Sequence, residues 1–306
     1  MIINIYMDKN MKIAYLITAY NNPNHLKKMI SKITCADSSF FIHVDLKSNI
    51  DDFSNIIGEN VFFTKYRLPV YWGEYSMVEA ILLLIREALN NSLNYDYLVL
   101  FSGSDYPIRS TEYIHDFLLR KKGTEFISMV RMPNLEAGFP LARINKMCLP
   151  STRPLGKFIV RVLGKMNLAG RDHKKYLNGL VPWGGSTWWA LTKDACRYIL
   201  SFVKDNDSIV NYFKHISCAE EMLFQTILGN SPFRERIHRN LIFMDWSAGG
   251  PHPAMIGPKH LALFEAVDKV VMNDAFGPGE VLFARKFSDN DPEKVRRIDE
   301  MIKKKG

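Results

Sequence analysis

Apolar runs alternate with amphipathic segments along the first 130 residues of the chain. The run at 12–19 is apolar almost throughout, and the segment 25–33 that follows it has apolar residues at helical spacing. A short, continuous apolar run is typical of a strand buried on both faces of a parallel sheet. The same alternation predicts further strands at 40–44, 61–63, 97–101 and 125–129, and further helices at 76–90 and 112–121. We therefore expect an α/β fold, with a mostly parallel central sheet and helices on both faces.

The regular pattern stops at 132 and returns near 188. The stretch 132–182 contains five prolines and several glycines, which indicates an irregular insertion. Inside it, the segment 155–166 (LGKFIVRVLGKM) is short, basic and partly amphipathic. This pattern fits an ordinary surface helix, and it also fits a helix that rests on a membrane or lines an acceptor groove.

The later part of the chain predicts a second set of elements. We expect strands at 188–192 and 241–244, helices at 193–203 and 219–228, an apolar strand-like segment at 282–287, and a last helix from 292 with Val295, Ile298 and Ile302 on one side. Gly229 is expected to follow the helix 219–228 as its C′ glycine. Since no repeat or linker separates independent units, we expect one domain over 1–306, with halves at about 12–130 and 131–290 and a C-terminal helix at 291–306.

Charge narrows the class of partner. The 306 residues include 40 Lys and Arg against 32 Asp and Glu, a formal net charge of +8. This balance suits a phosphate-bearing substrate, a polyanion or an anionic membrane surface. There is no RRM or zinc-finger signature and no basic arm except the last few residues, so nucleic-acid binding is not expected. No G-x-G-x-x-G follows the first strand and no P-loop string occurs, which disfavours a dinucleotide-binding Rossmann domain and a P-loop enzyme.

Cysteine usage and the N-terminus indicate a compartment. The four cysteines lie far apart and form no C-x-x-C pair, which favours reduced thiols. No apolar run reaches the roughly 18–20 residues that span a bilayer, and the first residues lack the ordered segments of a signal peptide. We expect a cytoplasmic protein, and Met11, directly before the first strand, is an alternative start to Met1.

Acidic residues follow two of the predicted buried strands. Asp45 comes directly after the strand 40–44, and Asp105 ends the small polar turn Ser102–Asp105 after the strand 97–101. In open α/β sheets, ligands bind beyond the carboxyl ends of the strands. Both aspartates are therefore site candidates, although Ser104 and Asp105 would equally suit simple capping of their turn.

A second acidic feature is the pair Glu220-Glu221, at the start of the predicted helix 219–228. A carboxylate in a first turn faces the positive end of the helix, which keeps it ionised. This suits a general base, which must meet its substrate deprotonated. Acidic residues are also common in first turns for stability alone.

Basic residues gather near the C-terminus. Lys259 and His260 follow a Gly/Pro-rich turn, and Arg285 and Lys286 interrupt the apolar string LFARKF. Because burial of an unpartnered charge is costly, at least one of Arg285 and Lys286 should be paired or should bind an anion. Phosphate is a natural partner for such groups.

This combination is what a sugar transferase with a nucleotide-sugar donor requires. A carboxylate takes the proton of the attacking hydroxyl while a diphosphate leaves, and the leaving charge is neutralised by Mg²⁺ or Mn²⁺ or by Lys and Arg. Metal-dependent enzymes usually hold the ion with an Asp-x-Asp after a central strand. The two such strings here, at 205–207 and 289–291, lie at predicted helix ends, and the central position has only Asp105. We therefore expect no metal. A metal-dependent transferase using Asp105 and a non-catalytic glycan- or nucleotide-binding protein remain alternatives.

Seven strings together carry a family resemblance: IHVDLKS (42–48), VYWGEYSMVEA (70–80), LFSGSDYPI (100–108), GGSTWWALTKD (184–194), AEEMLFQTIL (219–228), MDWSAGGPHP (244–253) and LFARKF (282–287). In this order the chain resembles the core-2/I-branching β-1,6-N-acetylglucosaminyltransferases, a family shared with peptide O-xylosyltransferases. It looks like the short bacterial members, since the cysteine-rich stem and membrane anchor of the animal enzymes are missing from the sequence.

The resemblance implies a GT-A-type fold, inversion at the anomeric carbon and use of a UDP-sugar without a metal. Glu221 matches the catalytic base. His43 and Asp45 of the HVD string would bind the nucleotide sugar, with Asp45 at the nucleoside. Lys286, with its neighbour Arg285, would bind the diphosphate.

The remaining site residues follow less directly from the resemblance. The second diphosphate-binding residue should lie a little over twenty positions before Lys286, where Lys259 and His260 both fit. Asp105, Ser104 and Glu220 would contact the sugar or the acceptor. The first half of the domain would bind the nucleotide sugar, and the second would hold the acceptor and the base.

Tryptophans and the C-terminal helix complete the expectations. Trp72, Trp183 and Trp246 are candidate sugar-stacking faces. Trp183 and Trp246 are favoured since they lie in Gly/Pro-rich turns, whereas Trp188 and Trp189 should belong to the core of a strand. The acceptor would be a glycan or a lipid-linked glycan of a bacterial surface polysaccharide. The basic residues of the last helix, Lys294, Arg296, Arg297, Lys303, Lys304 and Lys305, would suit peripheral contact with anionic lipid on the inner membrane face.

Overall fold

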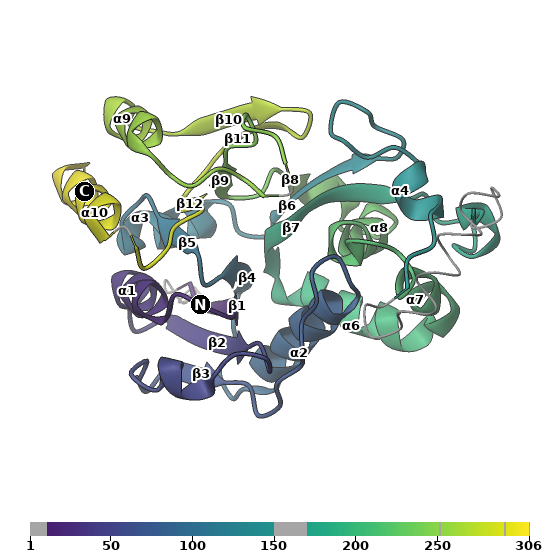
Figure 1. Ribbon diagram of the computed structural model, residues 1–306, viewed down its shortest axis with the longest axis horizontal. Coiled ribbons are helices and arrows are strands. Elements are labelled where there is room, and N and C mark those ends of the chain that lie inside the picture. The colour runs from purple at the N-terminus through teal and green to yellow at the C-terminus, as the bar shows by residue number, and fades with distance from the viewer. Residues whose placement is uncertain (1–10, 150–169, 251, 291, 306) are drawn as a thin grey trace, which may run out of the picture.

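The computed structural model describes residues 11–149, 170–250, 252–290 and 292–305 (Figure 1). A seven-stranded sheet forms its centre, with the strand order β3-β2-β1-β4-β7-β6-β8. Their bounds are β1 (Ile13–Ala19), β2 (Ser38–Val44), β3 (Val61–Phe63), β4 (Tyr97–Ser102), β6 (Glu125–Arg131), β7 (Trp183–Thr192) and β8 (Ile237–His238). β7 is antiparallel to both of its neighbours, and the other adjacent pairs are parallel. The prediction of an α/β fold with a mostly parallel sheet is confirmed.

The strands at the centre of the sheet are covered on both faces. Successive side chains of a strand point to opposite faces, and all five residues from Ile13 to Ile17 of β1 are fully buried. The ring of Tyr15 stacks on Phe40 of β2 and on Phe101 of β4, at centroid distances of 5.3 and 5.6 Å. The continuous apolar runs of the sequence therefore correspond to strands packed between two layers.

Helices supply these covering layers. The described helices are α1 (Pro23–Ile33), α2 (Ser76–Asn90), α3 (Thr111–Arg120), α4 (Ala142–Asn145), α6 (Lys193–Asp205), α7 (Asp207–Phe213), α8 (Leu223–Gly229), α9 (Pro258–Ala266) and α10 (Pro292–Lys305). The 3₁₀ turns are η1 (Ile50–Phe53), η2 (His173–Lys175), η3 (Ala219–Glu221) and η4 (Arg234–Arg236). α2 packs on β1, β2 and β4, whereas α8 packs on β6 and β7. On α10, Val295, Ile298 and Ile302 are buried as the spacing predicts. Among the described residues, no helix has the length and apolarity that crossing a membrane would require.

A small second sheet brings the C-terminal part of the chain to the end of β4. It has the order β5-β12-β9, formed by β5 (Asp105–Pro107), β12 (Phe283–Arg285) and β9 (Ile242–Met244). Arg285 is the register partner of Asp105 on one side and of Met244 on the other. Figure 1 shows these strands together, with the hairpin of β10 (Val271–Asp274) and β11 (Gly277–Glu280) beyond them. Asp105 therefore begins a strand, whereas the sequence predicted only a turn.

Two other expectations about elements need correction, and one lies outside the described residues. The helix predicted at 219–228 is divided into η3 and α8, because Met222 between them leaves the helical conformation (φ −135°, ψ −33°). Gly229 lies inside α8, whose C-cap is Asn230. The basic segment 155–166 is not among the described residues.

Two glycines allow β7 to lie close to its surroundings. A Cβ on Gly185 would lie 1.8 Å from the backbone oxygen of Ser128 on β6, and a Cβ on Gly184 would lie 2.2 Å from the ring of Phe139. The β6–β7 pairing changes register at this point, between Ile127 and Met129. The Gly-Gly string is thus required by close approach of the backbone.

Candidate active site

The acidic pair Glu220-Glu221 lies on the short turn η3. The turn is docked by Cys218, which has a left-handed backbone (φ 53°) and donates its N–H to Gly73 O at 3.0 Å. Gly73 is itself left-handed (φ 70°), and a Cβ there would lie 3.3 Å from Ser217 Oγ. The expectation that a helix end keeps Glu221 ionised is wrong, because a three-residue turn lacks the aligned peptides that make a macrodipole.

A cation from elsewhere in the fold faces Glu221 instead. Arg143 Nη2 on α4 lies 2.5 Å from Glu221 Oε2, and the two side chains retain 29% and 28% exposure. Burial raises the pKa of Glu221, and the guanidinium of Arg143 opposes that rise by attraction and by its hydrogen bond. Glu221 is thus partly open to solvent and has a fixed counter-charge.

Glu220 has a different environment from its neighbour. It is only 9% exposed, and its Oε2 has no hydrogen-bond partner among the described residues. Burial, and then repulsion from Glu221, raises the pKa of Glu220 to about 8. Glu220 therefore keeps its proton at neutral pH. Two adjacent carboxyls held in such different surroundings can take separate roles.

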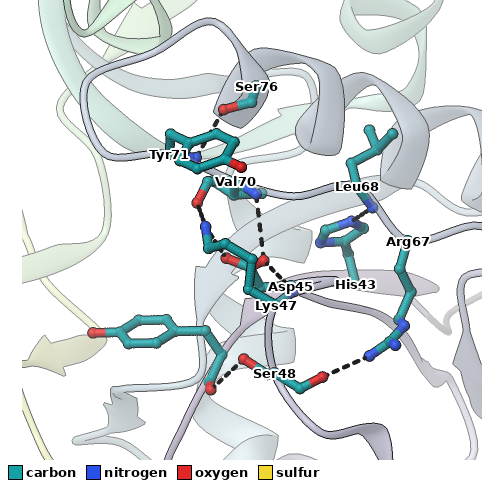
Figure 2. Close-up of polar contacts among 10 residues, drawn as sticks. His43, Asp45, Lys47, Ser48, Arg67, Leu68, Val70, Tyr71 and Ser76 are labelled. Carbon is teal, nitrogen blue, oxygen red and sulfur yellow. Dashed lines mark hydrogen bonds and ion pairs between the residues drawn. The ribbon is translucent and has the colours of Figure 1, made fainter. Parts of the chain in front are cut away.

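Asp45 lies at the end of β2 and organises the loop that follows β3 (Figure 2). Its Oδ1 accepts hydrogen bonds from the N–H groups of Lys47 (2.9 Å) and Val70 (3.4 Å), and its Oδ2 pairs with Lys47 Nζ at 3.0 Å. Lys47 Nζ also lies 4.3 Å from the ring centroid of Tyr71. Asp45 is 7% exposed, and both oxygens of its carboxylate have partners in this network.

His43 holds the same loop one step earlier. It is 1% exposed, and its Nε2 accepts the N–H of Leu68 at 2.9 Å, as Figure 2 shows. Burial lowers the pKa of His43, in agreement with a neutral ring that accepts at Nε2. The structure therefore gives His43 a part in fixing the loop, and its ring is not open to a ligand.

The loop 64–75 reaches from Asp45 to the acidic pair. It bonds His43 and Asp45 through Leu68 and Val70, and a few residues later Gly73 O accepts from Cys218 next to η3. A pocket of about 300 Å³ opens along it, lined by residues of the loop, by Ser76 and Glu79 of α2, and by Cys148, Leu149, Lys214 and Ile216. The two predicted subsites are thus joined by one short segment.

Asp105 and Arg285 form a buried pair at the end of β4. Asp105 is fully buried; its Oδ2 accepts the N–H of Ser102 at 2.6 Å, and its Oδ1 lies 3.5 Å from Arg285 Nε. The guanidinium also lies 4.2 Å from the ring of Trp188. Ser104 beside it is 3% exposed. The expectation of direct sugar contact by Asp105 and Ser104 is therefore corrected: both residues are buried, and Asp105 faces Arg285.

Lys286 follows Arg285 and is half-buried. Burial and the charge of Arg285 lower its pKa, and Asp105 acts in the opposite direction. Its carbonyl accepts the N–H of Ile256 at 2.9 Å, which ties it to the segment before α9. Arg285 and Lys286 thus place two cations at the end of the central strand, and Arg285 Nη1 is buried with no hydrogen-bond partner among the described residues.

Both candidates for the second diphosphate-binding residue meet at Asp245. Lys259 Nζ lies 2.8 Å and His260 Nε2 lies 2.7 Å from Asp245 Oδ2. His260 is 5% exposed and its Nδ1 accepts the N–H of Gly257, whereas the side chain of Lys259 is 68% exposed. Of the two, Lys259 has the ammonium that a ligand can reach.

The candidate stacking tryptophans are not equivalent. Trp72 and Trp246 are 70% and 50% exposed. The rings of Trp72 and His252 form an edge-to-face pair with a centroid distance of 6.2 Å. Trp183 begins β7, and its ring packs against Gly229: a Cβ on Gly229 would lie 2.5 Å from the Trp183 ring. The guanidinium of Arg234 lies 5.5 Å from the centroid of the same ring. Its expected position in a turn is wrong, and its ring serves packing. Trp188 and Trp189 are buried in the strand as predicted.

Several contributors were not predicted from the sequence. Arg143 lies in the irregular insertion and stands in no pattern that marks it, whereas Lys47 follows Asp45 in the string IHVDLKS. Asp245, which pairs with Lys259, belongs to the turn-rich string MDWSAGGPHP, so membership in a string was a signal for both Lys47 and Asp245. Over the described ranges, no group of three or more His, Cys, Asp and Glu side chains could hold a metal ion.

The model of the family described as "Core-2/I-Branching enzyme" matches residues 13–266. Xylosyltransferase 1 of Rattus norvegicus is 25% identical over 253 residues, which cover 79% of this chain and 29% of that protein. Xylosyltransferase 2 of Mus musculus is 24% identical over 250 residues, covering 77% and 27%. The chain thus spans less than a third of the length of these relatives. The solved structure of a 4-diphosphocytidyl-2C-methyl-D-erythritol synthase is similar at 11% identity and a TM-score of 0.33, over 69% of this chain and 91% of that one.

Proposed function

The chain belongs to the Core-2/I-branching enzyme family, and on that premise we propose that it is an inverting, metal-independent glycosyltransferase. In this proposal it moves GlcNAc or xylose from a UDP-sugar to a hydroxyl of a glycan. The observation that carries the proposal is the pair of cations at the end of the central strand, Arg285 and Lys286, in a fold that also presents a partly open carboxylate, Glu221.

The proposed reaction is a single displacement. Glu221 takes the proton of the acceptor hydroxyl while its oxygen bonds to the anomeric carbon, and the bond from that carbon to the diphosphate breaks on the opposite face. The electron pair leaves with UDP, whose new charge is stabilised by Lys286, Arg285 and Lys259. Asp45 and the loop 64–75 would bind the nucleoside, and Trp72, Trp246 and Glu220 would border the acceptor.

The alternative of a metal held by Asp105 receives less support. The carboxylate of Asp105 has no exposed surface and already faces Arg285. A metal ion bound to Asp105 would have to displace the guanidinium of Arg285. The proposal therefore keeps leaving-group stabilisation on protein side chains.

The acceptor and location are part of the same proposal. We place the acceptor among glycans or lipid-linked glycans of a bacterial surface polysaccharide, and the protein in the cytoplasm with peripheral contact to anionic lipid on the inner membrane face. The support is the net charge of +8 and the exposed lysines at the end of α10.

The test measures UDP release from UDP-GlcNAc and UDP-xylose with a panel of glycan acceptors. Glu221→Gln should lower kcat at least about 100-fold because it removes the proton acceptor, while the affinity for UDP stays within about twofold. Glu235→Gln is the matched control, since the side chain of Glu235 is 89% exposed. EDTA should leave the wild-type rate unchanged.

Three results would contradict parts of this proposal. Normal turnover by Glu221→Gln would overturn the assignment of the base. A strict requirement for Mn²⁺ would overturn metal independence. Binding of UDP-sugars without UDP release on any acceptor would indicate a non-catalytic binding protein.

A further inference from the structure

We propose that Arg143 is a positioning residue for Glu221: it holds Oε2 of the carboxylate so that Oε1 faces the acceptor and takes the proton. The inference rests on the proposed function, because it assigns Glu221 the role of base. Arg143 does not touch the reacting atoms in this proposal and acts through Glu221 alone. No pattern in the sequence marks Arg143, which lies in the irregular stretch after β6.

The contact engages one oxygen of the carboxylate. Arg143 Nη2 donates to Glu221 Oε2 at 2.5 Å, and among the described residues the ion pair of this carboxylate is made at Oε2 and not at Oε1. A guanidinium is planar and permanently charged, so it fixes orientation as well as charge. Oε1 is thereby left as the basic oxygen of the pair.

Two contacts besides Glu221 hold Arg143. Its guanidinium lies 4.4 Å from the ring centroid of Phe139, and its Nη1 donates to Gly138 O at 3.4 Å. Phe139 is 4% exposed and is fixed by a two-way backbone bridge with Asn134. The ring rests on Gly184 of β7, where a Cβ would overlap it at 2.2 Å. Gly184 therefore allows Phe139 to occupy the position in which its ring packs against Arg143.

The short helix α4 that carries Arg143 is also anchored. Ile144 is fully buried, and its carbonyl accepts Tyr212 Oη at 2.8 Å. Asn145 Oδ1 receives the N–H of His173 at 3.2 Å and lies 2.9 Å from His173 Nδ1. Arg143 thus extends from a fixed platform, which is what precise orientation of a base requires.

The other charges around Glu221 do not replace Arg143. η3 packs on α2, β7 and α8, and β7 and α8 contain no titratable residue. Glu220 on η3 itself has a pKa raised to about 8, and the thiol of Cys218 just before it has a pKa raised to about 11. α2 itself carries Glu79, Arg86 and Glu87, and Tyr75 precedes it; burial raises the pKa of Tyr75 above its usual value. None of these groups is among the causes of the pKa shift of Glu221. Arg143 is the cation that acts on Glu221.

The test compares Arg143→Met, Arg143→Lys and a control, Arg197→Met, whose arginine is 58% exposed on α6. Each protein is labelled with ¹³C at the glutamate side-chain carboxyl and titrated by NMR, and Glu221→Gln identifies the signal of Glu221. Removal of the cation should lower the acid dissociation constant of Glu221 about tenfold or more. Arg143→Lys should restore most of this ionisation, and Arg197→Met should change nothing.

Kinetics separates orientation from charge. With UDP-GlcNAc or UDP-xylose, Arg143→Met should move the acid limb of the kcat–pH profile to higher pH by the same factor and leave KM for the donor unchanged. Arg143→Lys should keep the acid limb of the kcat–pH profile where it is in the wild type. It should still lower kcat, because an ammonium lacks the planar arrangement of N–H donors by which a guanidinium orients a carboxylate.

Each outcome decides one point. An unchanged titration of Glu221 in folded Arg143→Met overturns the positioning role. An Arg143→Lys variant with wild-type kcat overturns the part assigned to orientation. A shifted titration without UDP release from the wild type overturns the proposed function and leaves the effect of Arg143 on Glu221 standing.

Discussion

At the scale of residues, adjacent carboxyls in this protein differ mainly in how they are buried. Glu220 and Glu221 are neighbours in sequence, yet Oε2 of Glu220 is buried with no hydrogen-bond partner among the described residues, whereas Glu221 faces a guanidinium. Their environments come from Arg143, Gly73 and Cys218, which are distant in sequence or unusual in backbone conformation. The identity of the acidic pair could be predicted from the sequence, but its electrostatics could not.

The raised pKa of Glu220 predicts a dependence of stability on pH. The folded-state pKa is about 8, above the ordinary value of 4.5. The native state therefore binds the proton more tightly than the unfolded state, and stability declines as pH rises from about 4.5 through about 8. Glu220→Gln removes this loss. Its Tm should match that of the wild type at pH 4 and exceed it by several degrees at pH 8.

Thermal unfolding at both pH values measures the effect, with Glu235→Gln as the exposed control. A Glu220→Gln variant that is less stable than the wild type at pH 8 would show that the native carboxylate is stabilised by a partner.

At the scale of elements, β7 depends on close approach to its neighbours. Gly185→Ala would place a Cβ 1.8 Å from Ser128 O, a backbone atom that cannot rotate away. We expect this substitution to lower the free energy of unfolding by about 2–4 kcal/mol. Urea denaturation followed by circular dichroism measures it.

Gly257→Ala is the matched control for this substitution. The nearest atoms to a Cβ there lie at 4.0 Å, so the loss should stay at or below about 1 kcal/mol. Equal unfolding midpoints for the two variants would contradict the steric argument.

Elements with strong periodicity were predicted well. The buried strands, α1, α2 and α10 all correspond to runs or spacings in the sequence. The division of the helix 219–228 and the small sheet β5-β12-β9 were not predicted. The first depends on the backbone of Met222, and the second on pairings between residues as distant as Asp105 and Arg285. Such long-range pairings are set by tertiary packing and leave no local signal.

At the scale of the whole molecule, the formal net charge is +8. Several basic side chains of α10 are nevertheless paired with other groups of the protein, so fewer of them are available to a membrane than the sequence suggests. Arg296 pairs with Glu293 and Glu300, Arg297 with Glu265, and Lys305 donates to the carbonyl of Phe264. Lys303 and Lys304 are exposed. Membrane contact, if it is electrostatic, should therefore depend mainly on the end of the helix.

Sedimentation with phosphatidylcholine vesicles, with and without phosphatidylglycerol, tests this. The wild type should bind only the anionic vesicles, and less at high salt, because exposed charges are screened beyond about 10 Å at 0.1 M. Lys303→Glu with Lys304→Glu should reduce binding to the level of neutral vesicles. Lys174→Glu with Lys175→Glu, which alters two exposed lysines near η2, should not. Equal loss in both pairs would indicate a response to net charge alone.

The loop 64–75 has a consequence for substrate binding. It is bonded at Val70 to Asp45 and at Gly73 to Cys218, only three residues apart. In the proposed function, a nucleoside that displaced the Val70 N–H from Asp45 would act on the loop whose Gly73 carbonyl holds Cys218, two residues before the acidic pair. If the nucleoside and the acceptor bind at these two places, any coupling through the loop would change both affinities by the same factor.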